Sequence, residues 1–140
     1  VIKYYKVNEF VRINGDSPFI LPSIIDKAVS LFCTRKYDLV TNIYPRSYPK
    51  GQSVEVVKSS ILVGSYKFQD MNQKEHVTKY FYDNYNKYKI KNFKLNSDFN
   101  HLSLAIDNSK DLANARKISK FSDENNLNIE DFIDLIIKVN

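Results

Sequence analysis

The sequence predicts an α/β layered fold, in which helices flank a mixed, mainly parallel sheet. Three observations support this prediction. Short apolar runs alternate with segments of helical spacing, turn-forming residues separate the two, and hydrophobic residues make up 43% of the 140 residues, which is enough for a buried core. A chain of this length is expected to form a single domain over residues 1–140.

The first elements are expected to alternate between helix and strand. Residues 1–8 are typical of the end of a helix, and residues 10–13 predict a short apolar strand. After a cluster of turn residues, Pro22 occupies the tolerated first turn of an amphipathic helix. Residues 37–41 predict a second strand, and residues 53–57 alternate as in a strand with one solvent-exposed face.

The C-terminal half is expected to continue this alternation. Asn108 and Asn128 are each followed three residues later by an acid, the capping-box arrangement that opens a helix. Cys33 lies in an apolar stretch and is expected to be a small core residue. The remaining expected elements are weakly helical residues 59–69, a helix over residues 74–88, and strands over residues 89–95 and 101–106.

Composition narrows the classes of function. The net charge is +5, but the lysines are scattered and no recognition motif occurs, so nucleic-acid binding is the weakest interpretation. No apolar run is long enough to span a membrane, and the N-terminus lacks a signal-peptide pattern. The single cysteine forms no disulfide within the chain, which favours the cytoplasm. Since no initiator Met is present, we expect the chain to begin inside a longer gene.

Two acids occupy matching places in the predicted fold. Asp16 lies just beyond the strand at residues 10–13, and Asp107 directly follows the one at residues 101–106; each precedes a helix. In open α/β sheets, ligands bind at the carboxyl ends of the strands. Magnesium is usually held there by one or two carboxylates together with substrate phosphates. The two acids therefore suggest a magnesium site of a nucleoside-triphosphate enzyme.

Local structure offers a second explanation for the same acids. Aspartate is common in turns and at helix starts for reasons unrelated to ligands. The common phosphate-binding and hydrolase fingerprints, which are the P-loop, GxGxxG and GxSxG, do not occur in the sequence. Spacing alone leaves both explanations open.

Four segments follow one another in the order and spacing of a known family: RINGDSPFI, YDLVTNIYPRSYPKGQSVEVV, KEHVTKYFYDN and HLSLAIDNSKDL. Together they resemble the spore-coat-polysaccharide type of cytidylyltransferase, which is related to the enzymes that make CMP-sialic acid and CMP-Kdo. The resemblance extends over about residues 1–121. It implies a Rossmann-like nucleotide-diphospho-sugar transferase fold, usually in a homodimer.

The chemistry that this resemblance implies is nucleotidyl transfer. A hydroxyl of a sugar or sugar acid attacks the α-phosphate of CTP, pyrophosphate leaves, and a CMP-sugar results for surface polysaccharide or glycan biosynthesis. The acid of the family's G-D-x-P segment falls on Asp16, and its strand-end acid falls on Asp107. Both residues are implied to bind Mg²⁺ and to support catalysis.

Four further positions match the family as candidate substrate contacts. Arg12 and Asn14 flank the turn that carries Asp16. The alternatives are that Arg12 is a strand residue whose charge lies in solvent and that Asn14 is a turn former. Arg46 is expected to pair bidentately with a substrate carboxylate, or else to be a solvated loop residue. His76 is expected to hydrogen-bond or assist proton transfer in the sugar pocket, or else to be a buried structural histidine.

The sequence also departs from the family. Ser53 replaces an acid of the family's G-L-D-V-E-V segment, which alters a local sugar or metal contact, and Lys110 replaces a helix-start acid. The family's basic, glycine-containing nucleotide loop precedes the position of Val1. We therefore expect residues 1–140 to be the C-terminal part of a longer domain and to be inactive alone. The alternative is a non-catalytic module of the same fold that binds a partner or an anionic ligand.

Overall fold

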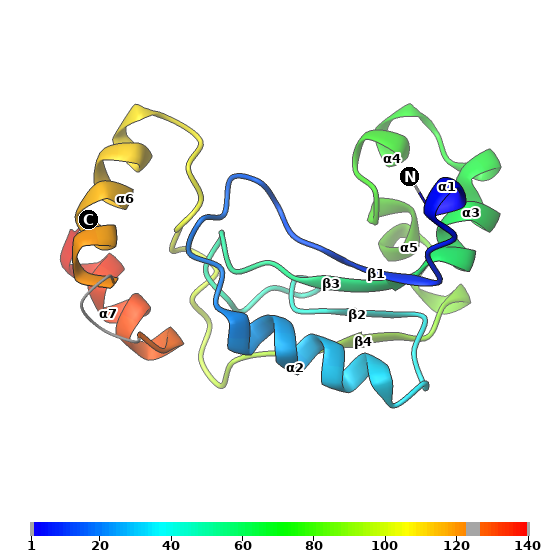
Figure 1. The fold of residues 1–140 in the computed structure, drawn as a ribbon, viewed down its shortest axis with the longest axis horizontal. Helices are drawn as coiled ribbons and strands as arrows, with labels where there is room; N and C mark the ends of the chain where they lie inside the picture. The colour runs from blue at the N-terminus through cyan, green and yellow to red at the C-terminus, as the bar shows by residue number, and fades with distance from the viewer. Residues whose placement is uncertain (1, 123–126, 140) are drawn as a thin grey trace.

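The computed structural model describes residues 2–122 and 127–139 of the chain. Figure 1 shows a central sheet with one long helix beside it, a group of short helices at one end and a helical hairpin at the other. The elements in chain order are α1 (Ile2–Tyr5), β1 (Glu9–Arg12), α2 (Pro22–Cys33), β2 (Leu39–Thr41), β3 (Glu55–Lys58), α3 (Ser59–Ser65), the 3-10 helix η1 (Tyr66–Phe68), α4 (Met71–Glu75), α5 (Lys79–Asp83), the 3-10 helix η2 (Tyr85–Lys87), β4 (Ile90–Asn92), α6 (Ser109–Ser122) and α7 (Ile129–Val139).

The described strands form one mixed sheet in the order β1-β3-β2-β4. Strand β3 runs antiparallel to both β1 and β2, whereas β2 and β4 are parallel. Strands β1, β2 and β4 therefore run in one direction, and β3 runs in the opposite direction. The carboxyl ends of β1, β2 and β4 thus lie at the same end of the strands, the end nearer to α6 in Figure 1. The predicted α/β class, with a mixed sheet flanked by helices, is confirmed, but the expected mainly parallel pairing is not, because β3 lies antiparallel between β1 and β2 and only β2 and β4 pair in parallel among the described strands.

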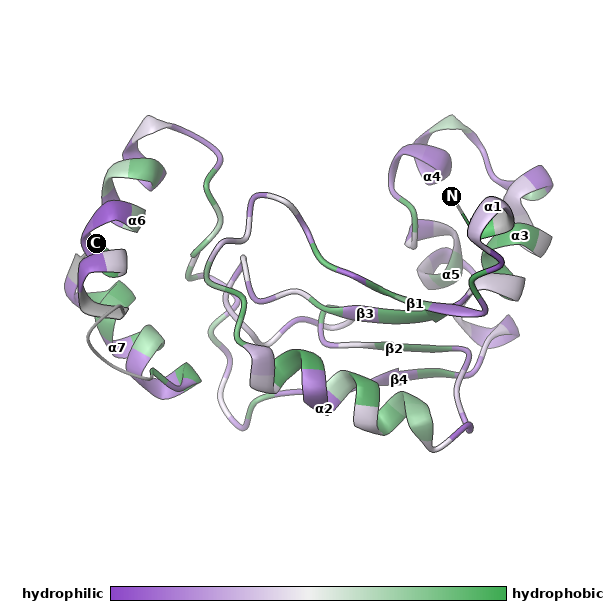
Figure 2. Cartoon of the chain, in the orientation of Figure 1, coloured by the Kyte–Doolittle hydropathy of each residue, from purple (hydrophilic) through white to green (hydrophobic). Residues whose placement is uncertain are grey.

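Each face of the sheet is covered by a different set of helices. On one face, Val40 and Val56 join the core that contains α2, whose buried residues recur every fourth position at Ile24, Ala28 and Phe32. On the other face, Leu39 and Val57 form a second core with Phe81 of α5, and with partly buried residues of α3. Figure 2 shows the corresponding hydrophobic colouring along the strands and along α2. The predicted solvent-exposed face of residues 53–57 is wrong, because helices cover both faces.

Two predicted elements form differently. The expected helix over residues 74–88 is divided into α4, α5 and η2, because the backbone of His76 leaves helical geometry (φ −101°, ψ 82°). The expected strand over residues 101–106 makes a single parallel bridge, from Ser103 to Lys50. Its partner is a short loop and not a strand, so no ladder extends along it. Cys33 is exposed at the end of α2 and is not the core residue that the sequence predicted.

The predicted capping boxes open the last two helices. The Asn108 side chain accepts hydrogen bonds from the N–H groups of Lys110 and Asp111, and the Asp111 carboxylate accepts from the Asn108 N–H. Asn128 and Asp131 repeat this exchange at the start of α7. Buried Phe132 of α7 lies against Phe19, with ring centroids 5.9 Å apart, which fixes the hairpin to the rest of the core. Within the described residues, no helix combines the length and apolarity needed to cross a bilayer.

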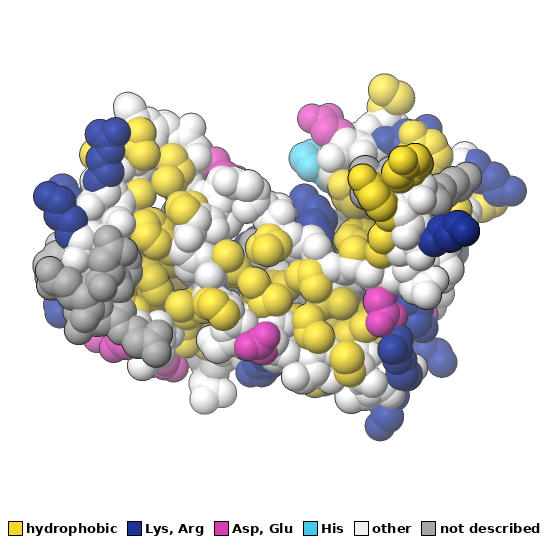
Figure 3. All heavy atoms as spheres, in the orientation of Figure 1, with side chains coloured by type: hydrophobic (Ala, Val, Ile, Leu, Met, Phe, Trp, Pro, Cys, Tyr) yellow, Lys and Arg dark blue, Asp and Glu magenta, His cyan; other side chains and the backbone are white. Residues whose placement is uncertain are grey.

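Strand β1 is an edge strand with exposed apolar side chains on it and just after it. Strand β1 lies at the edge of the described sheet, and its surroundings include exposed Val11 and Ile13. Figure 3 shows hydrophobic side chains gathered across the middle of the face that carries β1 and α2. An edge strand of this kind presents unpaired backbone groups to any further segment that can pair with it.

Asp38 ties two strands together and gives the fold a pH-dependent element. Its carboxylate accepts hydrogen bonds from Lys58 Nζ (2.8 Å) and from the Lys89 N–H (3.0 Å), which joins the end of β3 to the start of β4. Burial alone would raise the pKa of Asp38, but these hydrogen bonds outweigh it and leave the pKa below its usual value.

We predict that Asp38→Asn lowers the free energy of unfolding by about 1 kcal/mol at pH 7. Because the folded-state pKa is depressed, the stabilisation is present above the unfolded-state value of about 4 and is lost as the pH falls through the lower folded-state value. Urea unfolding of both proteins between pH 7 and pH 3 measures this difference. A stability gap that stays constant over that interval would contradict the assignment.

Candidate functional site

A row of polar residues crosses the sheet at the carboxyl ends of β1, β2 and β4. Arg12, Thr41 and Asn92 are the last residues of β1, β2 and β4, and Glu55 is the first residue of β3. The pairing register places Arg12 opposite Glu55, Glu55 opposite Thr41, and Thr41 opposite Asn92. Residues in one register row point to the same face, here the face covered by α3 and α5. The sheet thus ends in a polar row above an apolar core.

Glu55 is the centre of this row. Its side chain is 1% exposed, and a buried carboxylate is costly unless it is paired and hydrogen-bonded. Arg12 Nη1 lies 2.5 Å from Glu55 Oε2, and the Tyr82 hydroxyl of α5 donates to Glu55 Oε1. The Tyr82 oxygen also lies 3.1 Å from Thr41 Oγ1. Burial first, and then the charge of Glu55, raise the pKa of Tyr82 well above its usual value, so its hydroxyl stays protonated as a donor.

Arg46 brings a second guanidinium to the row from the loop after β2. Its Nη1 donates to Ser53 Oγ at 3.0 Å. Burial lowers the pKa of Arg46, and the charge of Glu55 partly offsets that effect. Among the described residues, no ion pair to Arg46 occurs, whereas Glu55 is paired with Arg12. Since Ser53 is neutral, the group formed by Glu55, Arg12 and Arg46 carries a formal surplus of one positive charge.

Two buried amides hold the loop after β2, and one of them, Gln52, joins it to the segment after β1. The Asn42 side chain donates to the Gln52 carbonyl (2.6 Å) and accepts from the Val54 N–H (3.0 Å). The Gln52 side chain accepts from the Leu21 N–H (3.1 Å) and donates to the Phe19 carbonyl (2.6 Å). Asn42 and Gln52 are fully buried, so these bonds cannot be exchanged for water without a large cost. They fix the loop that carries Arg46 relative to the segment that carries Asp16.

Gly51 makes the next connection. It has a positive φ of 88°, and a Cβ at this position would lie 2.7 Å from the Leu104 carbonyl carbon and 2.8 Å from the Ala105 nitrogen. On either side of this close approach, the Lys50 N–H donates to the Leu102 carbonyl and the Leu104 N–H donates to the Lys50 carbonyl. Residue 51 therefore has to be glycine for the segment before Asp107 to lie here.

The two acids that the sequence predicts as metal ligands lie on segments that meet. The Ile106 N–H donates to the Asp16 carbonyl at 2.9 Å, and Asp107 is the next residue. Both acids are exposed, and Asp16 Oδ1 accepts from the Ser17 hydroxyl. The neighbouring acid Asp111 is engaged differently, because its carboxylate accepts the N–H groups of Asp107 and Asn108 at the start of α6.

This arrangement suits an ion that is bound partly by a substrate. Among the described residues, no group of three His, Cys, Asp or Glu side chains is placed to hold a metal. Magnesium characteristically takes one or two protein carboxylates and completes its shell with water and phosphate oxygens. Asp16 and Asp107 are two exposed hard oxygen donors on adjacent backbone segments, so the donor set fits Mg²⁺ accompanied by phosphate.

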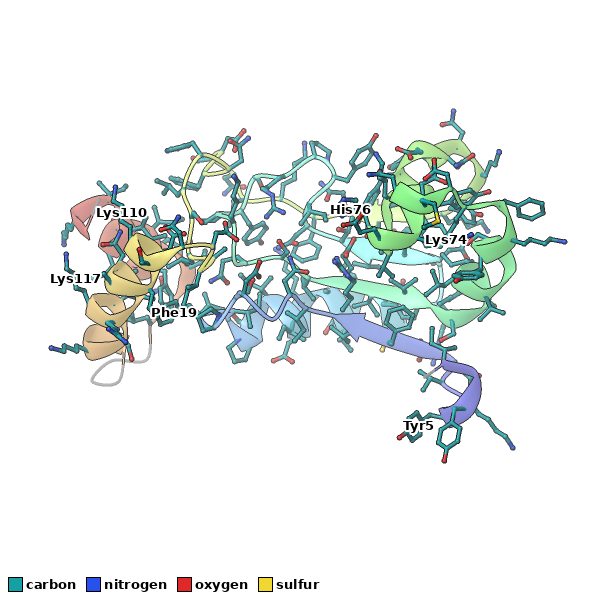
Figure 4. All side chains as sticks on the ribbon, turned by 90° about the horizontal axis from the view of Figure 1, so that it is seen from above. Tyr5, Phe19, Lys74, His76, Lys110 and Lys117 are labelled. Carbon is teal, nitrogen blue, oxygen red and sulfur yellow. The ribbon has the colours of Figure 1, made fainter. Side chains whose placement is uncertain are left out.

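The remaining candidates have less specific surroundings. The Asn14 carbonyl accepts from the Ser17 N–H at 3.3 Å and closes the turn that holds Asp16, in accord with the alternative of a turn former. His76 is exposed, so the alternative of a buried structural histidine is wrong. Figure 4 places it at the end of α4, on the side of the short-helix group that faces the middle of the molecule. Within the described part of the chain, no hydrogen bond or ion pair joins its side chain to Arg12, Arg46 or Glu55.

Cavities lie beside the Asp16 and Asp107 segments. One, of about 370 Å³, lies between residues 101–105 and α6 and includes His101, Ser103 and Asp111 in its lining. A second, of about 410 Å³, is lined by Pro18, Phe19, Ile106 and residues of α6. The linings include Pro18, Ile106 and Asp111, which are near the two acids in sequence, but neither lining includes Asp16 or Asp107.

Sequence reasoning missed the residues that organise the polar row. Glu55 was assigned to a solvent-exposed face of its strand, but an acid inside an apolar, β-branched run is a signal of a buried charge that needs a partner. Tyr82 lies in the predicted helix over residues 74–88, and no local pattern connects it to Glu55, which lies 27 residues earlier. The contacts of Asn92 likewise arise only from strand pairing.

Comparison with known proteins shows which fold this is. No family model matches the chain. It is 30% identical over 139 residues to a protein of Methanocaldococcus jannaschii described as uncharacterized protein MJ1063. This match covers 97% of the chain and 56% of that protein. It superposes on the solved structure of a cytidylyltransferase from Leptospira borgpetersenii serovar Hardjo-bovis (strain JB197) with a TM-score of 0.83 and 24% sequence identity.

The chain has the fold of that cytidylyltransferase. The superposition covers 99% of this chain and 58% of the solved one. The chain thus spans little more than half the length of both proteins that it matches. The expectation of a Rossmann-like transferase fold, based on sequence resemblance, agrees with the architecture of this neighbour.

We predict that Gly51→Ala destabilises the protein by about 2 kcal/mol or more. Alanine would be strained at the positive φ of this position, and its Cβ would overlap the backbone of Leu104 and Ala105. Gly64→Ala is a matched control. A Cβ at Gly64 in α3 meets nothing within 4 Å, so alanine there should be neutral or stabilising by about 0.5–1 kcal/mol. Urea denaturation measures both, and equal effects of the two substitutions would refute the close approach.

We predict that Glu55→Gln lowers the free energy of unfolding by about 2–3 kcal/mol, because Arg12 then loses its buried counter-charge. Glu9→Gln is the control, since Glu9 pairs with Arg35 at a similar 2.6 Å but in an exposed position. That substitution should cost less than about 1 kcal/mol. Denaturation of both variants at pH 7 compares them, and a similar small loss in each would show that burial of Glu55 does not matter.

Proposed function

We propose that this chain is part of a nucleotidyltransferase, a cytidylyltransferase that activates a sugar or sugar acid as a CMP-sugar. One observation supports this proposal above the others. The segments that carry Asp16 and Asp107 meet through the Ile106–Asp16 hydrogen bond, on a chain that shares its fold with a cytidylyltransferase. These segments offer two exposed carboxylates for an ion, and the polar row carries a surplus of positive charge for an anion.

The reaction is a displacement at phosphorus. A hydroxyl oxygen of the sugar forms a bond to the α-phosphorus of CTP, the bond from that phosphorus to the bridging oxygen breaks, and pyrophosphate leaves with the bonding electron pair. The hydroxyl proton passes to water or to a basic side chain near the acceptor. Such reactions need mainly alignment and charge stabilisation from the protein.

Each predicted site residue has a role in this proposal. Asp16 and Asp107 hold Mg²⁺, which when bound neutralises the charge that develops on the bridging oxygen and pyrophosphate. Arg12 and Asn14 lie on the strand end and turn that lead to Asp16 and contact nucleotide or sugar. Arg46 binds the anionic group of the acceptor, and His76 contributes a hydrogen bond or a proton transfer from the end of α4.

The proposal applies to the full-length protein. Both proteins matched are much longer than this chain, and β1 is an edge strand of the described sheet with exposed Val11 and Ile13 on it and just after it. We propose that residues 1–140 are the C-terminal part of a larger domain whose N-terminal part covers that edge and supplies the nucleotide loop. On this view, residues 1–140 alone are inactive, and the complete enzyme is a cytoplasmic homodimer in polysaccharide or glycan biosynthesis.

We predict that Asp16→Asn in the full-length protein reduces CTP-dependent pyrophosphate release by about 100-fold, which corresponds to the loss of roughly 2–3 kcal/mol of charge stabilisation. Asp107→Asn should raise the Mg²⁺ concentration needed for half-maximal rate. Asp26→Asn, at an exposed position on α2, is the control and should leave both quantities unchanged.

The assay uses CTP, Mg²⁺ and a panel of sugars and sugar acids, with folding of each variant checked by circular dichroism. Wild-type rates in a well-folded Asp16→Asn protein would remove the proposed role of that residue. If no sugar elicits pyrophosphate release from the wild-type protein, the alternative of a non-catalytic binding module of the same fold takes its place.

A further inference from the structure

An exposed tyrosine is held rigidly beside the polar row. The Tyr44 ring stacks on the Tyr82 ring, with centroids 4.6 Å apart and planes inclined by 18°, and Tyr85 lies tilted at 5.9 Å. Tyr44 is nevertheless 44% exposed. The inner side of the Tyr44 ring is covered by Tyr82, whose hydroxyl donates to buried Glu55. Tyr44 therefore extends the polar row with an aromatic surface that is open to solvent.

The backbone of Tyr44 is fixed as firmly as its ring. The Asn92 side chain accepts from the Tyr44 N–H (3.2 Å) and donates to the Pro45 carbonyl (3.0 Å). Thr41 Oγ1 accepts from the Ile43 N–H, and a bridge between Ile43 and Arg46 closes the turn. Thr41 and Asn92 are members of the polar row, so the sheet itself sets where the Tyr44 ring lies.

This geometry is preorganised for a ring-shaped ligand. An aromatic face carries partial negative charge and attracts the C–H bonds on the flat side of a sugar ring. Because stacking and backbone bonds already hold Tyr44, a ligand that lies on it loses little affinity to ordering of the protein. Arg46 lies two residues further along the same turn, with no acid paired to it among the described residues.

We infer that Tyr44 is a specificity-determining residue, whose open face binds the ring of an acidic acceptor sugar while Arg46 binds the anionic group of that sugar. The inference rests on the proposed function and adds a subsite to it. The surplus positive charge of the Glu55, Arg12 and Arg46 group favours an anion at this place. A neutral cytosine base would satisfy the aromatic surface but would leave that charge uncompensated.

The test compares Tyr44→Ala with Tyr44→Phe in the full-length protein. Loss of the ring should raise the KM for the acidic sugar by about three- to tenfold and leave the KM for CTP unchanged. Phenylalanine retains the stacking surface and should stay within about twofold of wild type. Tyr66→Ala is the control, since Tyr66 is an exposed tyrosine on η1 that contacts Lys74 instead.

Arg46→Gln provides a second variant that leaves the tyrosine stack intact. It removes the guanidinium that is proposed to bind the anionic group and should raise the KM for the acidic sugar by about tenfold without affecting the KM for CTP. An unchanged sugar KM in both Tyr44→Ala and Arg46→Gln overturns the inference while the proposed function stands. A rise in the KM for CTP in Tyr44→Ala also overturns it, because the ring then contacts the nucleotide.

Failure of the proposed function has a different signature. If the wild-type protein releases no pyrophosphate with any acceptor, titration calorimetry with sialic acid and Kdo as probes decides the matter. Binding that is present in wild type and Tyr44→Phe but lost in Tyr44→Ala supports the subsite without the reaction. Absence of binding to the wild-type protein overturns the subsite as well.

Discussion

The buried carboxylate of Glu55 constrains the rest of the site. A charge that is 1% exposed has to be compensated by partners in fixed places, and Glu55 takes them from two different elements. Arg12 comes from the end of β1, and Tyr82 comes from α5 on the covering face. Compensation of one charge therefore positions an edge strand, a helix and a guanidinium at the same time. Arg46 remains as a second cation whose charge a ligand can use.

The loops around this charge are joined through hydrogen bonds to the main chain. The buried side chain of Gln52 connects the loop after β2 to the segment after β1, and Lys50 and Gly51 connect that same loop to residues 102–105. The Ile106–Asp16 bond completes a closed set of three segments. The backbone is thus satisfied internally, while the carboxylates of Asp16 and Asp107 stay exposed. Such a division suits a site that must hold its ligands in place without reorganisation.

Where sequence patterns and structure agree, the signal is local. The Asn108 and Asn128 capping boxes and the first-turn proline at Pro22 mark helix starts because the relevant hydrogen bonds and dihedral angles involve neighbouring residues. Where they disagree, the deciding partner is remote. Residues 101–106 have the composition of a strand, but among the described residues they form only a single bridge, between Ser103 and Lys50. The helical spacing of residues 74–88 likewise does not reveal the break at His76.

The sequence by itself determined the α/β class, the mixed sheet and the starts of α2, α6 and α7, because periodicity and turn chemistry act over a few residues. Only the tertiary structure decided that Glu55 is buried and that the Asp16 and Asp107 segments are in contact. The same holds for the stacking of Tyr44 on Tyr82. Each of these pairs joins residues far apart in the chain, and strand register and loop closure alone bring such residues together.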